Sequence, residues 1–152
     1  VYMLSTPYPQ LAAEFTFQRK PSERPAQWVQ PGGAGKVGYL DGFVVSGQPD
    51  EMAELVKNGQ VATYALHCPG VASMARTNEP NSADTQFFLM RQANDAVDAT
   101  YTVWGRAVAG LDVIRAIKAG PDESDGRMPA GVADKLSKAV IVADLPEARR
   151  PV

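Results

Sequence analysis

Histidine and cysteine are almost absent from this chain, whose 152 residues include one of each, His67 and Cys68. A single cysteine excludes an internal disulfide framework and a thiolate metal site. One histidine leaves no spare general base for a Ser-His-Asp or Cys-His relay. On a strand the two adjacent side chains point to opposite faces. We therefore interpret both as packing residues near a strand end, and we expect no metal site of three or four converging ligands.

A charge excess and long hydrophobic runs are missing as well. Fifteen Lys and Arg residues oppose seventeen Asp and Glu residues, which leaves a net charge of −2 at pH 7. Composition therefore points to no nucleic acid partner and no acidic membrane surface. No run approaches the roughly 18 apolar residues of a spanning helix, so we expect no membrane span. The chain opens at Val1 rather than Met and shows no signal peptide, which leaves processing or truncation, and the compartment, open.

Glycine and proline are abundant, with 13 and 12 residues. Together they make up about one residue in six, against an average nearer one in eight. That surplus favours a turn-rich, strand-dominated protein over a helical bundle. A chain of this length can bury roughly 68–70% of its unfolded surface, enough for one core. We expect a single, mainly β domain over residues 1–152.

Apolar and β-branched runs bounded by turn residues predict the strands, and Asp41-Gly42 predicts a hairpin turn within residues 37–45. The remaining predicted strands are 61–66, 70–76, 86–90, 100–108 and a buried terminal strand at 138–143.

Two short helices are predicted between the strands. The first begins at Asp50 as N-cap, presents Met52, Leu55 and Val56 on its apolar face and ends at Gly59. The second spans 111–118, with Leu111, Ile114 and Ile117 on one face. Residues 18–36 and 119–134 are predicted loops. Within the first loop, residues 32–36 (GGAGK) superficially resemble a phosphate-binding loop. We reject that function because a Ser/Thr after Lys36, a preceding apolar strand and a following helix are all missing.

The region with most chemical information is 70–110. On a strand Gln86 and Phe88 share one face and Phe87 faces the opposite way, toward the core. With Met74 and Tyr101 on neighbouring strands, the first face predicts a groove that is half apolar and half hydrogen-bonding. The alternative is that the two phenylalanines simply lie between a core and a second layer.

Four strings in this region carry a family resemblance: Met74-Ala75-Arg76, 82–89 (SADTQFFL), 101–106 (YTVWGR) and 110–113 (GLDV). In order and spacing they resemble the cyclophilin family of peptidyl-prolyl isomerases. Residues 7–15 resemble an upstream strand of bacterial members, and the predicted strand near Val140 resembles the last barrel strand. The resemblance implies a mainly β fold, a cyclophilin-like antiparallel β-barrel with short helices, in which residues 18–60 are an insertion or loop region.

The resemblance also implies the site residues. Phe88 forms the floor of a proline pocket and Gln86 hydrogen-bonds the substrate backbone, so these two are the catalytic candidates. The candidate substrate-binding residues are Met74, Ala75, Arg76, Val97 on the pocket wall and Tyr101. Ala96 stands where the family has Trp or Phe, which leaves part of the rim without its usual side chain.

The family's catalytic arginine has no counterpart here. Residues 39–48 match the arginine strand only superficially, because Gly38 falls at the arginine position, Ser46 falls at the glutamine position and the string follows residues 7–15 instead of preceding them. We interpret it as a lookalike. We expect the arginine strand, with the first strand and helix before it, to precede Val1, and residues 1–152 alone to isomerise slowly. Within the chain, Arg76 or Arg91 could stand in.

The reaction itself suits these residues. Rotation about a peptide bond faces a barrier of about 18–20 kcal/mol and breaks no bond, so it needs no nucleophile, metal or cofactor. The leading hypothesis is an isomerase that acts on Xaa-Pro bonds of polypeptide substrates. One alternative is a proline-peptide binding or scaffolding module with little turnover, and another is an unrelated structural β domain. The resemblance slightly favours a periplasmic over a cytoplasmic location, and the oligomeric state stays open.

Overall fold

The computed structural model describes residues 8–31, 35–121, 127–129 and 131–149. The chain divides into two compact units, Val1–Arg115 and Ala116–Val152, and each is described by itself. The described residues are mainly β, with antiparallel strands and a few short helices, as the sequence predicts. None of the helices in these residues is long and apolar enough to cross a membrane.

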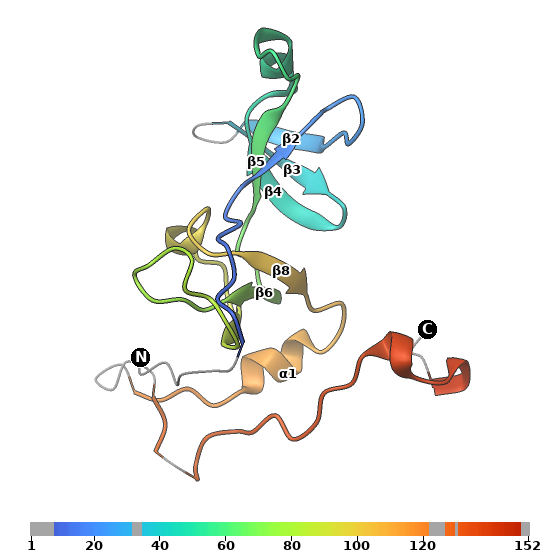
Figure 1. Cartoon of the computed structure of the whole chain (residues 1–152). Coiled ribbons are helices and arrows are strands. Elements are labelled where there is room, and N and C mark those ends of the chain that lie inside the picture. Colours follow the sequence, from blue (N-terminus) through green and yellow to red (C-terminus); the bar gives the residue numbers. More distant parts are fainter. Residues whose placement is uncertain (1–7, 32–34, 122–126, 130, 150–152) are drawn as a thin grey trace. The chain divides into compact units, whose positions relative to one another are not determined.

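The larger sheet of the first unit has five antiparallel strands in the order β1-β5-β4-β3-β2 (Figure 1). Leu40, Val45 and Val61 are its buried apolar residues. The strands are β1 (Phe17–Arg19), β2 (Gln27–Pro31), β3 (Lys36–Leu40), β4 (Phe43–Gly47) and β5 (Val61–Ala65).

The predicted hairpin forms at β3 and β4, where Leu40 pairs with Phe43. Asp41 and Gly42 have φ angles of 48° and 81°, and two consecutive positive φ angles define the type I′ turn that Asp-Gly favours. Gly38 on β3 is required for a different reason. A Cβ atom there would lie 2.3 Å from the carbonyl oxygen of Gln27, so only glycine lets β2 approach.

The prediction of a loop over 18–36 is wrong. It contains the end of β1, all of β2 and the first residue of β3. These strands are short and their partners lie far away in sequence: Phe17 pairs with Thr63. Pro31 closes β2 at the sheet edge, where a missing N–H group is tolerated. Residues 32–34, in the rejected phosphate-loop string, lie outside the described residues.

Part of the helix predicted from Asp50 forms, as the 3₁₀ helix η1 (Asp50–Leu55), but its N-cap is Pro49. The Asp50 carboxylate accepts a hydrogen bond from Trp28 Nε1 at 3.1 Å and forms an ion pair with Arg19. Met52 and Leu55 are 38% and 76% exposed, so the expected apolar face is not buried. The Asp50 carboxylate, which the sequence predicted would cap the helix, instead bonds to Trp28 and Arg19.

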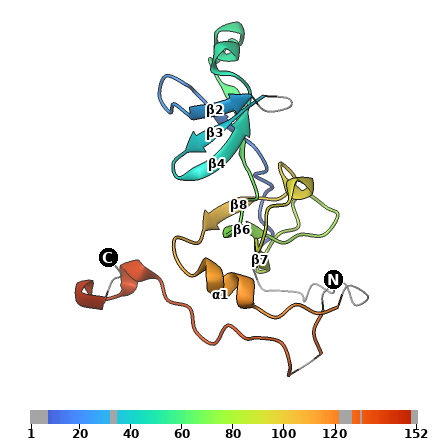
Figure 2. The same ribbon diagram turned by 180° about the vertical axis from the view of Figure 1, so that it is seen from behind.

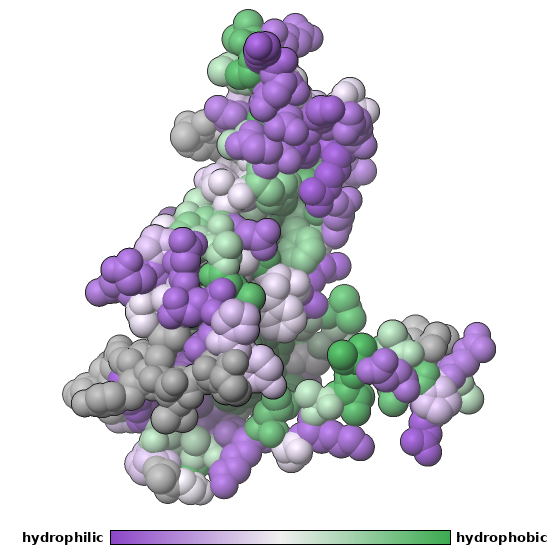
Figure 3. Space-filling view, viewed as in Figure 1, coloured by the Kyte–Doolittle hydropathy of each residue, from purple (hydrophilic) through white to green (hydrophobic). Residues whose placement is uncertain are grey.

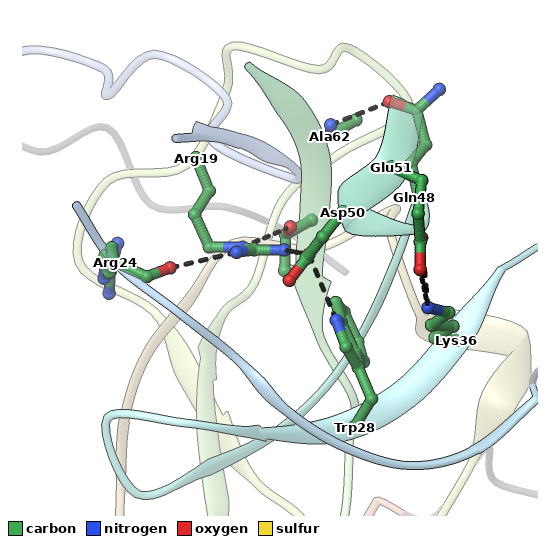
Figure 4. A network of polar contacts seen from close by, with 9 residues as sticks. Arg19, Arg24, Trp28, Lys36, Gln48, Asp50, Glu51 and Ala62 are labelled. Atoms are coloured by element: carbon green, nitrogen blue, oxygen red, sulfur yellow. Dashed lines mark hydrogen bonds and ion pairs between the residues drawn. The ribbon is translucent and has the colours of Figure 1, made fainter. Parts of the chain in front are cut away.

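Arg19 is the most buried charged residue of this sheet, with 1% of its surface exposed. Its Nη2 atom lies 2.5 Å from Asp50 Oδ1, its Nη1 atom donates to the Arg24 carbonyl at 2.9 Å, and its Nε atom donates to Thr63 Oγ1 at 3.4 Å (Figure 4). The guanidinium also lies over the Trp28 ring, 5.4 Å from its centroid. One side chain thus joins β1 to β5, β2 and η1.

The smaller sheet has three antiparallel strands, β7 (Phe87–Leu89), β6 (Val71–Met74) and β8 (Val103–Arg106), with β6 in the middle (Figure 2). They fall within the predicted strands. Val71, Ala72 and Ser73 of the central strand are all buried. Strand pairing leaves this sheet separate from the larger one, and the described strand pairs do not close a barrel.

Short segments flank the smaller sheet. The helix α1 (Leu111–Ala116) is two residues shorter than predicted and buries Ile114, while Ile117 is 41% exposed. The 3₁₀ helix η2 (Asp95–Val97) precedes β8. Apart from Pro7, which is not described, the strand expected at 7–15 is reduced to one bridge between Leu11 and Ala83.

In the second unit the predicted buried strand at 138–143 is wrong. The described residues there include the 3₁₀ helices η4 (Val142–Asp144) and η5 (Glu147–Arg149). Val140 and Ile141 are 54% and 69% exposed, and Figure 3 shows green hydrophobic residues beside purple hydrophilic ones on this C-terminal segment. An apolar run becomes a buried strand only when another strand pairs with it, and here it has no such pairing. The described part of the loop predicted at 119–134 has neither helix nor strand, and residues 122–126 and 130 lie outside the description.

Candidate functional site

The seven residues that the sequence singled out share one property: each is half-buried, neither core nor fully exposed. This is the burial expected of side chains that line a groove. They come from β6 and the residues that follow it, from β7 and the residue before it, and from the end of η2 and the turn that leads to β8. The residues are Met74, Ala75, Arg76, Gln86, Phe88, Val97 and Tyr101.

Three of these side chains form a contiguous aromatic and cationic cluster. The ring of Phe88 meets the ring of Tyr101 edge to face, with centroids 5.4 Å apart. The guanidinium of Arg76 lies over Tyr101, 4.7 Å from the ring centroid, and also over Phe15 at 5.1 Å. Its Nε atom donates to the Thr100 carbonyl at 2.9 Å and its Nη1 atom to the Thr77 carbonyl at 2.8 Å.

Backbone hydrogen bonds set the positions of the other groove residues. The Ala75 amide donates to the Gln86 carbonyl at 2.9 Å, and the Met74 amide donates to the Thr102 carbonyl at 3.0 Å. These bonds extend the β6 pairing on both sides. Within the described residues the Gln86 side-chain amide has no hydrogen-bond partner, so it can bond to a ligand.

Val97 is held by the turn that follows η2. The Thr100 hydroxyl and amide both donate to the Val97 carbonyl, at 2.9 and 3.3 Å. Ala99 completes this turn with a φ angle of 53°. The next residue, Asp98, links this turn to His67, whose ring stacks on Phe88.

Beneath the cluster lies a buried polar chain of three residues. His67 is 2% exposed, its Nδ1 atom lies 2.8 Å from Asp98 Oδ1, and its Nε2 atom lies 2.8 Å from Ser73 Oγ. The His67 ring is nearly parallel to Phe88, with centroids 6.0 Å apart and 17° between the planes. The Asp98 carboxylate also accepts the His67 backbone N–H at 2.7 Å.

This chain corrects the expectation that no Ser-His-Asp arrangement can form. The order of contacts is that of a hydrolase triad, but Ser73 has 0% of its surface exposed. A hydroxyl that no substrate can reach is not a nucleophile, so the interpretation of His67 as a packing residue is correct. No sequence signal predicted the chain, because Ser73 and Asp98 lie 6 and 31 residues from His67.

Two further expectations concern Phe87 and Arg91. Phe87 was predicted to face the core but is 47% exposed, and it packs edge to face on Trp104, itself 55% exposed, at 5.7 Å. That face of the small sheet is open, so alternation assigned the two faces correctly but not their burial. Arg91 donates from Nη2 to the Arg115 carbonyl at 2.6 Å, which ties it to α1.

Two questions remain for the chemistry near the site: the reactivity of the Cys68 thiol and the capacity to bind a metal ion. Burial, and secondarily the charge of Asp98, raises the pKa of the Cys68 thiol above its usual value. The described residues contain no group of three or more His, Cys, Asp or Glu side chains that could hold a metal ion.

Known proteins resemble this chain in sequence and in fold. A family model described as "Cyclophilin type peptidyl-prolyl cis-trans isomerase/CLD" matches residues 15–142. A protein of Brucella abortus (strain 2308) named "Probable peptidyl-prolyl cis-trans isomerase" is 37% identical over 99 residues, which are 65% of this chain and 46% of that protein. A "Peptidyl-prolyl cis-trans isomerase" of Acinetobacter baylyi is 31% identical over 90 residues, 56% of this chain and 47% of that protein.

The crystal structure of cyclophilin AquaCyp293 from Hirschia baltica matches with a TM-score of 0.81 and 34% identity, over 94% of this chain and 52% of that one. Because the match covers 94% of this chain, AquaCyp293 has counterparts for most of residues 18–60. The chain belongs to the cyclophilin-type peptidyl-prolyl cis-trans isomerase family. It spans about half the length of the Brucella and Acinetobacter relatives.

Proposed function

We propose that this chain carries the proline-binding groove of a peptidyl-prolyl cis-trans isomerase that acts on polypeptide substrates. The uncatalysed rotation takes tens to hundreds of seconds because the amide resonance must be broken, although no covalent bond is. A protein can accelerate it by gripping the proline ring, holding the flanking backbone and favouring the twisted amide. The groove residues are suited to the first two tasks.

The observation that carries this proposal is the half-buried Phe88 ring framed by Tyr101. The accessible part of this apolar ring, beside the ring of Tyr101, suits the compact, apolar ring of a proline. Gln86 lies two residues before Phe88 and, by alternation, on the same face, where a peptide lying along the groove would present its carbonyl and N–H groups. In this assignment Phe88 and Gln86 touch the substrate, while Met74, Ala75, Arg76, Val97 and Tyr101 shape the groove around it.

One observation favours the alternative of a binding module with little turnover. Arg76 is the arginine of the groove cluster, and two of its nitrogens already donate to backbone carbonyls. Its plane is also covered by Phe15 and Tyr101. A guanidinium so engaged is poorly placed to follow charge that develops on a twisting amide.

Exchange NMR on the full-length protein separates these functions. A peptide with one Xaa-Pro bond is mixed with a small amount of protein, and a Xaa-Ala peptide serves as the control. Exchange cross-peaks between the cis and trans proline signals demonstrate isomerisation. Shifted Phe88 and Tyr101 ring signals without exchange cross-peaks demonstrate the binding module, and a protein that produces neither effect contradicts both functions.

A further inference from the structure

We propose that His67 is a positioning residue that holds the floor and the wall of the proline pocket in one fixed arrangement. The inference rests on the proposed function, because it concerns the same pocket. It is carried by the joint contacts of one buried ring with Phe88, Ser73 and Asp98.

The first contact supports the floor. Phe88 is half-buried, with the Tyr101 ring nearly perpendicular to it and the His67 ring stacked nearly parallel to its plane. A ring packed on two sides has few orientations available. Stacking by His67 therefore limits how Phe88 can tilt when a proline ring presses on it.

The second contact supports the wall. Asp98 follows Val97 directly and is the C-cap residue of η2. Its carboxylate accepts both the ring Nδ1–H and the backbone N–H of His67. These two bonds fix the turn that follows Val97 relative to the short segment after β5, which lies 31 residues away in sequence.

The third contact fixes the ring itself. Ser73 lies on the central strand β6, opposite Phe88 in the strand register. Its hydroxyl pairs with His67 Nε2 at 2.8 Å and neither group is accessible to water. Because a buried polar group without a partner is costly, this bond strongly restricts rotation of the imidazole. The ring is thus locked at three points: a face, Nδ1 and Nε2.

Variants of His67 can separate the stacking of its ring on Phe88 from the hydrogen bonds of its two ring nitrogens. His67→Phe keeps a ring to stack on Phe88, but its side chain cannot bond to Ser73 or to the Asp98 carboxylate. His67→Gln keeps polar atoms but loses the ring. The double variant His67→Phe/Ser73→Ala removes both partners of the inner hydrogen bond, and matched apolar replacement of both partners can be nearly neutral for folding. The bond from the His67 backbone N–H to Asp98 is available in all three.

The test compares these variants in the full-length protein by steady-state isomerisation of an Xaa-Pro peptide and by NMR of the Phe88 and Tyr101 rings. A merely structural role lowers the amount of folded enzyme, which lowers apparent kcat at unchanged KM. A positioning role raises KM, because the slot for the proline ring loses its shape. Misplacement by about 1 Å can cost up to about 100-fold in rate, and we expect kcat/KM of His67→Gln to fall by about 10- to 100-fold.

Val61→Ala is the matched control, because Val61 has 0% exposure and lies on β5 of the larger sheet. It is expected to destabilise the fold while KM and the ring signals stay at wild-type values. The double variant is expected to bring KM part of the way back from the raised value of His67→Gln to the wild-type value, because its ring still stacks on Phe88.

Two results overturn the inference in different ways. If the wild-type protein isomerises the peptide, and His67→Gln matches Val61→Ala in KM and in the Phe88 signals, then His67 is structural only. If the wild-type protein neither isomerises nor binds the peptide, the proposed function is wrong, and so is the inference about His67.

Discussion

The guanidinium of Arg76 lies over the ring of Tyr101 at 4.7 Å, and Tyr101 in turn meets Phe88 edge to face at 5.4 Å. The cation therefore acts on the groove through Tyr101. Its hydrogen bonds to the Thr77 and Thr100 carbonyls hold it over that ring. In the proposed function, this arrangement assigns Arg76 to the support of Tyr101 in the groove wall.

Arg76→Ala is expected to weaken binding of a prolyl peptide by about 2- to 5-fold, because one partly exposed cation–π contact contributes about 0.5–1 kcal/mol. Arg76→Lys should recover little of this, since an ammonium lacks the planar fork that reaches two carbonyls and stacks on a ring. Titration calorimetry measures the affinity. Wild-type affinity in Arg76→Ala would show that Tyr101 needs no such support.

Phe88→Ala is expected to abolish prolyl-peptide binding and leave a folded domain, because Phe88 is half-buried and is the floor of the groove in the proposed function. The matched control is its neighbour Phe87→Ala on the opposite, 47% exposed face, which should bind normally. Peptide titration by NMR gives the affinities and circular dichroism the fold. The reverse pattern, normal binding in Phe88→Ala and lost binding in Phe87→Ala, contradicts the assignment of faces.

Asp50→Ala is expected to lower the free energy of unfolding by about 3 kcal/mol, near the lower end for breaking a buried ion pair. The Arg19 side chain is fully buried, while that of Asp50 is 32% exposed, and the variant leaves the guanidinium without its counter-charge. Trp28 also loses its acceptor. Urea unfolding measures the change.

Glu51→Ala is the control for this prediction. Glu51 is the next residue, and its carboxylate lies 3.0 Å from Lys36 Nζ at an exposed position. The pKa of Glu51 is lowered by its backbone hydrogen bond and by Lys36, but solvent screens such exposed pairs. Little change is expected, and equal losses in the two variants would show that burial of Arg19 does not decide the effect.

The thiol of Cys68 should react slowly with iodoacetamide in the native protein. Burial, and then the Asp98 charge, raises its pKa, so at pH 8 the thiolate fraction is smaller than in free cysteine. The rate should therefore rise with pH along a curve displaced to higher pH than that of glutathione. Unfolding in urea should remove the displacement, and a native curve at or below that of glutathione contradicts the expectation.

The cyclophilin family, the small sheet and the hairpin could be predicted from the sequence, because each is indicated by short stretches of neighbouring residues. Alternation placed β6, β7 and β8 within a few residues of their observed bounds, and two adjacent residues, Asp41 and Gly42, specify the hairpin turn. The seven groove candidates came from short strings, and all seven proved half-buried. Their functional roles, and the status of residues 18–60 as an insertion in a single domain, stay predictions.

Where the burial or the hydrogen bonding of a residue depends on a partner far away in sequence, only the tertiary structure decided it. Arg19, inside a predicted loop, can be buried because its guanidinium bonds to Asp50 and Thr63. The apolar run at 138–143 reads as a strand but pairs with none, and Phe87 faces an open surface. His67 is joined to Ser73 and Asp98 by hydrogen bonds across a fold that no local pattern encodes. Short-range patterns set backbone preference and side-chain alternation, whereas burial and hydrogen-bond partners depend on which segments meet.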